Sequence, residues 1–231
     1  WSIMAQYIEA KCAGCGAVSE IPAYNIINVK DHPELKEKVK DGSMFVWGCK
    51  NCGKVNLAAF QTLYHDPDES LMIWLMPDTL SDAEKQMIEQ HMVAISAQLS
   101  SDENGELLKG YTLRRVKDAG SLIEKVNIFD AGLDDVAMEM CKYVTKMELA
   151  EKAQDKESAL AIRNASFKFY KIDGPDNDIT FTYPSEGKME GVKIGFNTYE
   201  DCRGIIKRNP DVIPAPGFAI VDSEWLSTKM R

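Results

Sequence analysis

The sequence lacks the segments and motifs by which many enzymes and membrane proteins are recognised. It holds three histidines in 231 residues and carries no Walker phosphate-binding motif, no His-Glu-x-x-His motif and no Gly-x-Ser-x-Gly motif. Its longest apolar run, residues 71–76, has strand length, whereas a membrane helix needs about 20 apolar residues. No basic segment followed by an apolar stretch marks an export signal. We therefore expect a cytoplasmic protein without a membrane span.

The charge balance is acidic. Lysine and arginine number 27 against 36 aspartates and glutamates, which gives a formal net charge of −9, and 45% of the residues are hydrophobic. This composition is typical of a globular chain, and its length allows one to three domains. Because neutralising phosphates requires clustered lysine and arginine, the net charge disfavours nucleic acid as a general partner.

Four of the six cysteines form two matching pairs. Cys12 and Cys15, and likewise Cys49 and Cys52, enclose two residues and are followed directly by glycine. This is the sequence form of a zinc knuckle, in which a tight turn directs two thiolates inward. Two knuckles supply the four thiolates of a closed tetrahedral shell, so we predict a structural Zn²⁺ site at these four cysteines.

Other cysteine chemistries fit this pattern less well. A redox Cys-x-x-Cys normally occurs once, beside a βαβ pattern, and disulfides need an oxidising compartment. A rubredoxin-like iron site uses the same four thiolates, so iron stays the alternative metal. The remaining two, Cys141 and Cys202, lie among apolar residues in helical patterns and are expected to be buried and inert.

The spacing between the knuckles predicts an inserted helix. Positions 16–48 comprise 33 residues, whereas a minimal zinc ribbon has about 15–20. The excess matches a helix over residues 31–42, with Asp31 as N-cap, Pro33 in the first turn and Gly42 at its end. We therefore predict a zinc-ribbon-like antiparallel β domain in which this helix separates two β-hairpins.

Helices dominate the middle of the predicted fold. Ser81 and Glu84 have capping-box spacing at the start of a helix over residues 81–99, and Ser121 with Glu124 repeats that spacing. Another amphipathic helix begins at Asp134. The polar residues 100–105 predict a loop.

In the C-terminal part, apolar residues recur at every second position, as in a β-strand. Alternation over residues 179–183 and 192–196, preceded by residues 167–172, predicts an antiparallel meander, and Thr198 is expected to cap the helix that follows. The predicted class is α+β. The predicted domains are a zinc-ribbon-like domain over 1–78, a mainly helical segment over 79–150 and an α+β domain over 151–231.

Several segments together resemble the CpXC family, a group of bacterial and archaeal proteins named for their cysteine motifs. The resemblance covers roughly residues 8–145 and rests on both knuckles, on residues 28–45, on Tyr64, His65 and Asp66, and on residues 124–135. In this family proline often follows the first cysteine of a knuckle, whereas Ala13 and Lys50 stand there in this chain. The resemblance implies a zinc-ribbon-like fold and no particular reaction.

His65 and Asp66 are the weak catalytic candidates. An adjacent carboxylate can orient or charge an imidazole. The alternative is a structural turn, since the sequence from Asp66 to Asp68 has strong turn chemistry. We favour the structural interpretation, because a catalytic histidine needs a partner nucleophile that the sequence does not reveal.

Three functional hypotheses follow from these patterns. The leading one is a zinc-stabilised module that binds a protein partner, since a closed thiolate shell explains a fold and not a reaction. The alternatives are a nucleic-acid-associated zinc-ribbon regulator, disfavoured by the acidic charge, and an enzyme that uses His65 and Asp66. The sequence on its own favours a protein without enzymatic activity.

Overall fold

The computed structural model describes residues 5–100 and 110–230. The chain divides into two compact units: the first contains the residues up to Ile123 together with Ala215–Ile220, and the second contains Glu124–Pro214 and Val221–Arg231. The division falls inside the helix Ala119–Asp130, whereas the sequence suggests boundaries after residues 78 and 150. The three-segment division stays a prediction, and each unit is described here by itself.

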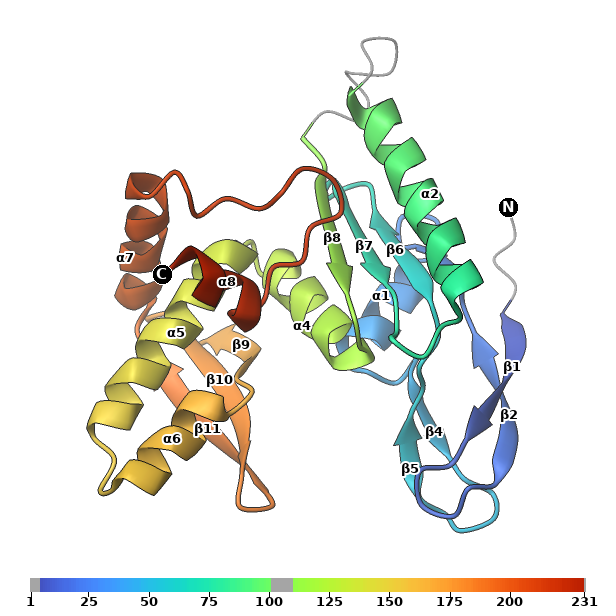
Figure 1. The fold of residues 1–231 in the computed structure, drawn as a ribbon, viewed down its shortest axis with the longest axis horizontal. Coiled ribbons are helices and arrows are strands. Elements are labelled where there is room, and N and C mark those ends of the chain that lie inside the picture. Colours follow the sequence, from blue (N-terminus) through green and yellow to red (C-terminus); the bar gives the residue numbers. More distant parts are fainter. Residues whose placement is uncertain (1–4, 101–109, 231) are drawn as a thin grey trace. The chain divides into compact units, whose positions relative to one another are not determined.

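The first unit contains two hairpins, a four-stranded sheet and helices (Figure 1). Its strands are β1 (Gln6–Lys11), β2 (Val18–Ala23), β3 (Ile26–Asn28), β4 (Val46–Gly48), β5 (Val55–Leu57), β6 (Thr62–Asp66), β7 (Leu71–Leu75) and β8 (Thr112–Val116). Its helices are α1 (Pro33–Lys40), α2 (Asp82–Ser100) and the beginning of α4 (Ala119–Asp130).

The sheet of the first unit has the order β3–β6–β7–β8, with β6 and β7 antiparallel and the outer pairs parallel. All five side chains of β7 are buried, as expected for a central strand that is covered on both faces. Met72 and Trp74 on one face of β7 pack with Ile88 and Met92 of α2. Helix α2 therefore covers this face of the sheet, as Figure 1 shows.

The second unit packs helices against an antiparallel meander. Its helices are the end of α4, α5 (Asp135–Glu151), α6 (Lys156–Asn164), α7 (Phe196–Arg208) and α8 (Ser223–Lys229), and its strands are β9 (Lys168–Asp173), β10 (Asp178–Ser185) and β11 (Lys188–Ile194). Strand β10 lies between the other two, and the pairing with β9 shifts by one residue between Thr180 and Phe181. Phe167, Phe181 and Met138 lie in its core.

The α+β class and the C-terminal meander are confirmed, and so are two helix starts. The side chain of Ser81 accepts from the backbone N–H of Glu84 at 3.2 Å, and that of Asp134 accepts from Ala137 at 2.8 Å. These contacts satisfy backbone donors that have no partner within the first turn of a helix.

Three predicted helix starts are wrong by one to three residues. The first helix is preceded by His32 and not by Asp31, and no side chain caps it. Helix α4 begins before Ser121, because Asp118 accepts from the Ser121 backbone N–H at 2.7 Å and takes the capping position. Helix α7 begins at Phe196, which places Thr198 inside its first turn.

One further prediction concerns a loop, and one helix has no counterpart among the predictions. The predicted loop over 100–105 falls at the end of α2 and on residues outside the described part of the chain. Helix α6 was not predicted from the sequence. Within the described residues, no helix is long and apolar enough to cross a membrane.

Candidate metal centre

Both knuckles occupy the turn of a β-hairpin, as the sequence predicts. Strand β1 pairs with β2 around the first knuckle, and β4 pairs with β5 around the second (Figure 1). The two turns share one hydrogen-bond pattern: Cys12 N donates to Ala17 O and Gly16 N to Cys12 O, while Cys49 N donates to Lys54 O and Gly53 N to Cys49 O.

A glycine closes each of these turns for a conformational reason. Gly16 and Gly53 have φ angles of 77° and 76°, a region that costs other residues about 1–2 kcal/mol. The near-identical angles show that the matching sequences fold into matching turns.

The four knuckle thiols lie together. All four Sγ atoms are within 4.8 Å of one another, and the Cys12–Cys52 and Cys15–Cys49 pairs are each 3.6 Å apart. Tetrahedral coordination with metal–sulfur bonds of about 2.3 Å places neighbouring sulfurs about 3.8 Å apart. The sulfur positions therefore fit a tetrahedral metal ion, and each close pair joins one hairpin to the other.

Amide groups around the thiols add directed N–H···S contacts. The backbone N–H of Gly14 lies 3.3 Å from the Cys12 Sγ, and the Asn56 side-chain amide lies 3.5 Å from the same atom. The amide of Asn51 lies 3.4 Å from the Cys15 Sγ. Because these donors favour the thiolate form, they stabilise the charge state that a metal ligand requires.

Asn56 also connects the two hairpins. It lies on β5, is 8% exposed, and its side-chain oxygen accepts from Ala13 N of the first knuckle at 3.0 Å. Its amide nitrogen additionally donates to Lys54 O at 3.1 Å. Asn56 is not among the predicted site residues, although the sequence carries one signal for it: a polar side chain between Val55 and Leu57, at the alternate position of a strand that flanks a knuckle.

The pKa values of the cluster diverge. The backbone N–H of Cys15, followed by the amide of Asn56, lowers the pKa of Cys12 to about 6. Although the backbone N–H of Lys54 acts in the lowering direction, hydrogen bonds with Cys15 and Cys12 raise the pKa of Cys52 to about 11. One thiol of the group thus ionises readily while another retains its proton, and a metal ion that binds all four must displace that proton.

The first cysteine of each knuckle is buried and the second is exposed. Cys12 and Cys49 are 2% and 4% exposed, whereas Cys15 and Cys52 lie at the surface. A metal ion can therefore reach the cluster from the exposed side. Four cysteine sulfurs fill a tetrahedral shell, so a bound ion would serve structure and not activate a water molecule.

The two other cysteines are buried in the second unit, as predicted. The hydrogen bond that Cys141 shares with Cys202, followed by burial, raises the pKa of Cys141 above its usual value. A buried protonated thiol is a poor nucleophile, which agrees with the expectation that Cys141 is inert, whereas the same hydrogen bond lowers the pKa of Cys202.

His65 and Asp66 are adjacent on β6, but the two side chains have different partners. The Nε2 atom of His65 lies 2.8 Å from the hydroxyl of Tyr111. The Asp66 carboxylate binds Lys36 Nζ at 3.0 Å and accepts from the backbone N–H of Glu69 at 3.2 Å. Asp66 thereby anchors α1 and caps the turn after β6. These contacts give Asp66 a structural role, and the polar group that lies beside the imidazole of His65 is the hydroxyl of Tyr111.

Comparison with known protein families adds one finding. The family model described as CpXC protein matches residues 10–142, which is more than half of the chain. No curated protein and no solved structure matches the chain. The matched region contains both knuckles, so the chain belongs to the CpXC family.

Proposed function

We propose that this member of the CpXC family binds one structural Zn²⁺ ion at Cys12, Cys15, Cys49 and Cys52, and that the two hairpins joined by the ion form a binding surface for a protein partner. The observation that carries the proposal is an exposed apolar surface on the hairpins whose turns bring the four thiols together. We expect the protein to act in the cytoplasm, where thiols stay reduced.

Zinc is preferred because the site offers sulfur alone in a tetrahedral arrangement and no open position. Zn²⁺ has a filled d shell and takes this arrangement in structural sites. Iron can use the same ligands. Elemental analysis of fresh, reduced protein separates the two metals, and a coloured centre containing iron would replace zinc in the proposal.

The apolar surface is clearest on the second hairpin. Val46, Val55 and Leu57 are 49%, 66% and 54% exposed, and pairing of Val46 with Leu57 places all three on one face. The opposite face carries Asn56, which is buried toward the metal centre. Solvent-exposed valine and leucine on one strand face favour contact with another apolar surface.

The first hairpin adds a hollow beside the centre. Tyr7 and Val18 are 72% and 62% exposed, and together with Lys50 and Asn51 of the second knuckle they line a cavity of about 520 Å³. Aromatic residues of this kind are frequent anchors in protein interfaces. The lining residues come from both hairpins, so the hollow depends on the contact that a shared metal ion would stabilise.

A protein partner explains this surface better than nucleic acid. Phosphate recognition requires a basic surface, whereas the chain carries a net charge of −9 and Glu20 lies among the residues of the hollow. Apolar contacts also predict binding that depends weakly on salt. A steep loss of binding with salt would instead support the nucleic-acid alternative.

The test uses zinc-loaded full-length protein carrying a photo-crosslinker at residue 57, in extract of its native cells. We expect one partner to be crosslinked, and we expect Val55→Ser and removal of zinc by a chelator to abolish that crosslink. Val93→Ser is the matched control, because Val93 is 71% exposed on α2, outside the hairpins. Crosslinking that survives Val55→Ser and chelation would refute the proposal.

A further inference from the structure

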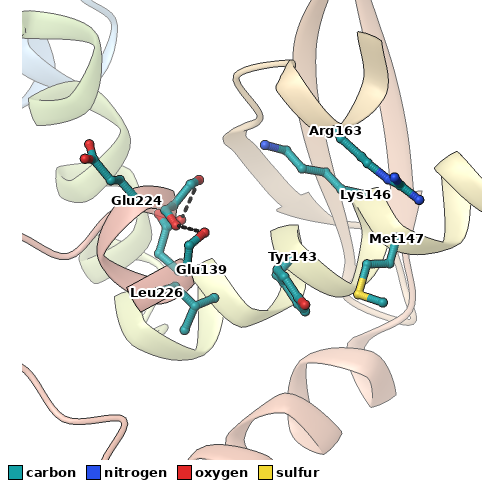
Figure 2. Close-up of a pocket in the computed structure, with 9 residues that line it drawn as sticks. Glu139, Tyr143, Lys146, Met147, Arg163, Glu224 and Leu226 are labelled. Carbon is teal, nitrogen blue, oxygen red and sulfur yellow. Dashed lines mark hydrogen bonds between the residues drawn. The ribbon is translucent and has the colours of Figure 1, made fainter. Parts of the chain in front are cut away.

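The second unit contains a hollow whose lining includes none of the residues of the metal centre. It has a volume of about 440 Å³, within the range of small-molecule sites. Helices α5, α6 and α8 supply its walls, and Figure 2 shows the side chains. The lining residues are Glu139, Tyr143, Lys146, Met147, Arg163, Ser223, Glu224, Leu226 and Ser227.

One side of the hollow is basic. Within the described part of the chain, neither Lys146 nor Arg163 makes an ion pair. The Lys146 Nζ lies 5.2 Å from the centre of the Phe167 ring, and burial followed by the charge of Lys142 lowers the pKa of Lys146. An anionic group bound beside Lys146 would relieve the repulsion between Lys146 and Lys142, and Arg163 is a second cation in the lining.

The other side is acidic and carries hydroxyl groups. Glu139 is 3% exposed, and its Oε2 accepts from Ser223 Oγ at 3.2 Å while its Oε1 binds Lys142 Nζ at 2.8 Å. These contacts fix a buried carboxylate in the wall. Glu224 is an exposed carboxylate beside it, and Figure 2 shows Glu139 and Glu224 on the side opposite Arg163.

The floor between the two sides is apolar. Leu226 is 1% exposed, Tyr143 is half-buried, and Met147 remains 45% exposed at the edge. Methionine adapts to irregular shapes, so this surface suits a flexible hydrocarbon chain. The hollow thus combines a basic end, an apolar floor and an acidic end.

We propose that this hollow binds a small zwitterionic ligand, with an acidic group held by Lys146 and Arg163, an amine held by Glu139 and Glu224, and a hydrocarbon body over Tyr143 and Leu226. The opposed charges select against ligands with a single charge, because each leaves one end of the hollow with an unpaired group. The acidic group can be a carboxylate or a phosphate, since both match the two cations.

The test compares three probes of equal length on the zinc-loaded full-length protein: 6-aminohexanoate, hexanoate and hexylamine. Binding is followed by the ¹³C-methyl resonance of Met147, which Met147→Leu assigns. We expect 6-aminohexanoate to bind about three- to fivefold more tightly than either singly charged probe, which is the contribution of one exposed ion pair. 6-aminohexyl phosphate then shows whether phosphate is preferred to carboxylate.

Two substitutions in the hollow separate its ends. Arg163→Met should reduce the advantage of 6-aminohexanoate over hexylamine, because Lys146 alone remains at the basic end, and should leave hexylamine binding unchanged. Glu224→Gln should reduce its advantage over hexanoate, because Glu139 alone remains at the acidic end. Lys156→Met and Glu157→Gln are matched controls on α6, where both residues are exposed and outside the lining.

Three results would overturn the proposal. The first is a Met147 resonance that stays unchanged up to the solubility limit of every probe. The second is equal affinity for the three probes, and the third is an affinity for 6-aminohexanoate that neither substitution in the hollow alters.

Discussion

Replacing Lys142 by methionine should destabilise the second unit by about 3–5 kcal/mol, because it leaves two buried carboxylates without their cation. Lys142 Nζ lies 2.6 Å from Glu124 and 2.8 Å from Glu139, and the exposed fractions of the three residues are between 2% and 6%. Methionine keeps the length and much of the volume of the lysine side chain. The substitution therefore removes the charge with little change in packing.

The magnitude follows from two opposing terms. At an effective dielectric constant of about 20, each contact supplies a gross attraction of about 6 kcal/mol. Desolvating three charges cancels most of that gain, so an intact buried pair contributes little net stability. Removing the cation alone leaves the desolvation of Glu124 and Glu139 uncompensated, which is why the loss is large although the intact network is worth little.

The free energy of unfolding of Lys142→Met should change with pH in the opposite direction to the contribution that Glu124 makes in the parent protein. Although burial raises the pKa of Glu124, the charges of Lys142 and Lys168 hold it below its usual value. Stability from Glu124 is therefore fully present above its unfolded pKa of about 4.3 and is lost as the pH falls further. In Lys142→Met burial dominates and raises the pKa of Glu124, so protonation near pH 4 should restore part of the lost stability.

Hydrogen exchange of the α5 amides measures the local free energy of opening, and urea denaturation followed by circular dichroism measures the global effect. The triple variant Glu124→Gln, Glu139→Gln and Lys142→Met should be more stable than Lys142→Met alone. Lys146→Met, one turn further along α5, should change stability by less than about 1 kcal/mol. A loss below about 1 kcal/mol for Lys142→Met, or no gain on acidification, would refute the reasoning.

The remaining predictions concern the first unit. Fresh, reduced protein should contain about one zinc ion per chain, and Cys49→Ser should lose it together with the protection of both hairpins in hydrogen exchange; metal-free protein with intact hairpins would contradict this. Asn56→Leu should retain zinc about 10–100-fold less well against a competing chelator, because the leucine cannot contact Cys12 or Ala13 as the amide does. Burial lowers the pKa of His65, so its contribution to stability is complete above its unfolded pKa of about 6.5 and is lost as the pH falls below it. The melting temperature of His65→Gln should therefore fall less than that of the parent protein between pH 7 and pH 5, and parallel curves would contradict this assignment.

The position of the two thiols within each knuckle follows directly from local sequence, whereas the close sulfur pairs join residues 34 and 40 positions apart. Each knuckle places two thiols and a glycine within five residues, and the hydrogen bonds that define the turn are complete within six. The two hairpins are expected to meet because one tetrahedral metal ion needs the two thiolates of each knuckle. Asn56 was harder to predict, because its importance depends on a contact with Ala13, 43 positions earlier.

Helix starts show where local patterns compete. Ser121 and Glu124 have the spacing of a capping box, yet Asp118 accepts from the Ser121 backbone N–H and begins the helix earlier. Glu124 is then free to turn inward, where it accepts from Phe169 N at 2.6 Å. Asp118 and Ser121 are both acceptable caps and lie three positions apart. The structure uses Asp118, and in this arrangement Glu124 contacts Phe169 of β9, 45 positions away.

The buried charges of the second unit mark the limit of sequence patterns. Glu124, Glu139 and Lys142 lie on amphipathic helices, where charged side chains ordinarily face water. Their burial depends on partners from α4, α5 and β9 that no spacing rule brings together.

The same network ends at the surface of the hollow, where Glu139 meets Ser223 of α8, 84 positions later. A buried charge network often makes a fold less stable than apolar residues of the same volume would. Its presence in a core is therefore easier to understand where the charges also have a function. A fixed carboxylate in the wall of a hollow can offset this cost through binding, because it is already in place for a ligand and needs no rearrangement. If the buried network serves binding, the triple variant that restores stability should also weaken the binding of 6-aminohexanoate, whereas a network that serves the fold alone would leave binding unchanged.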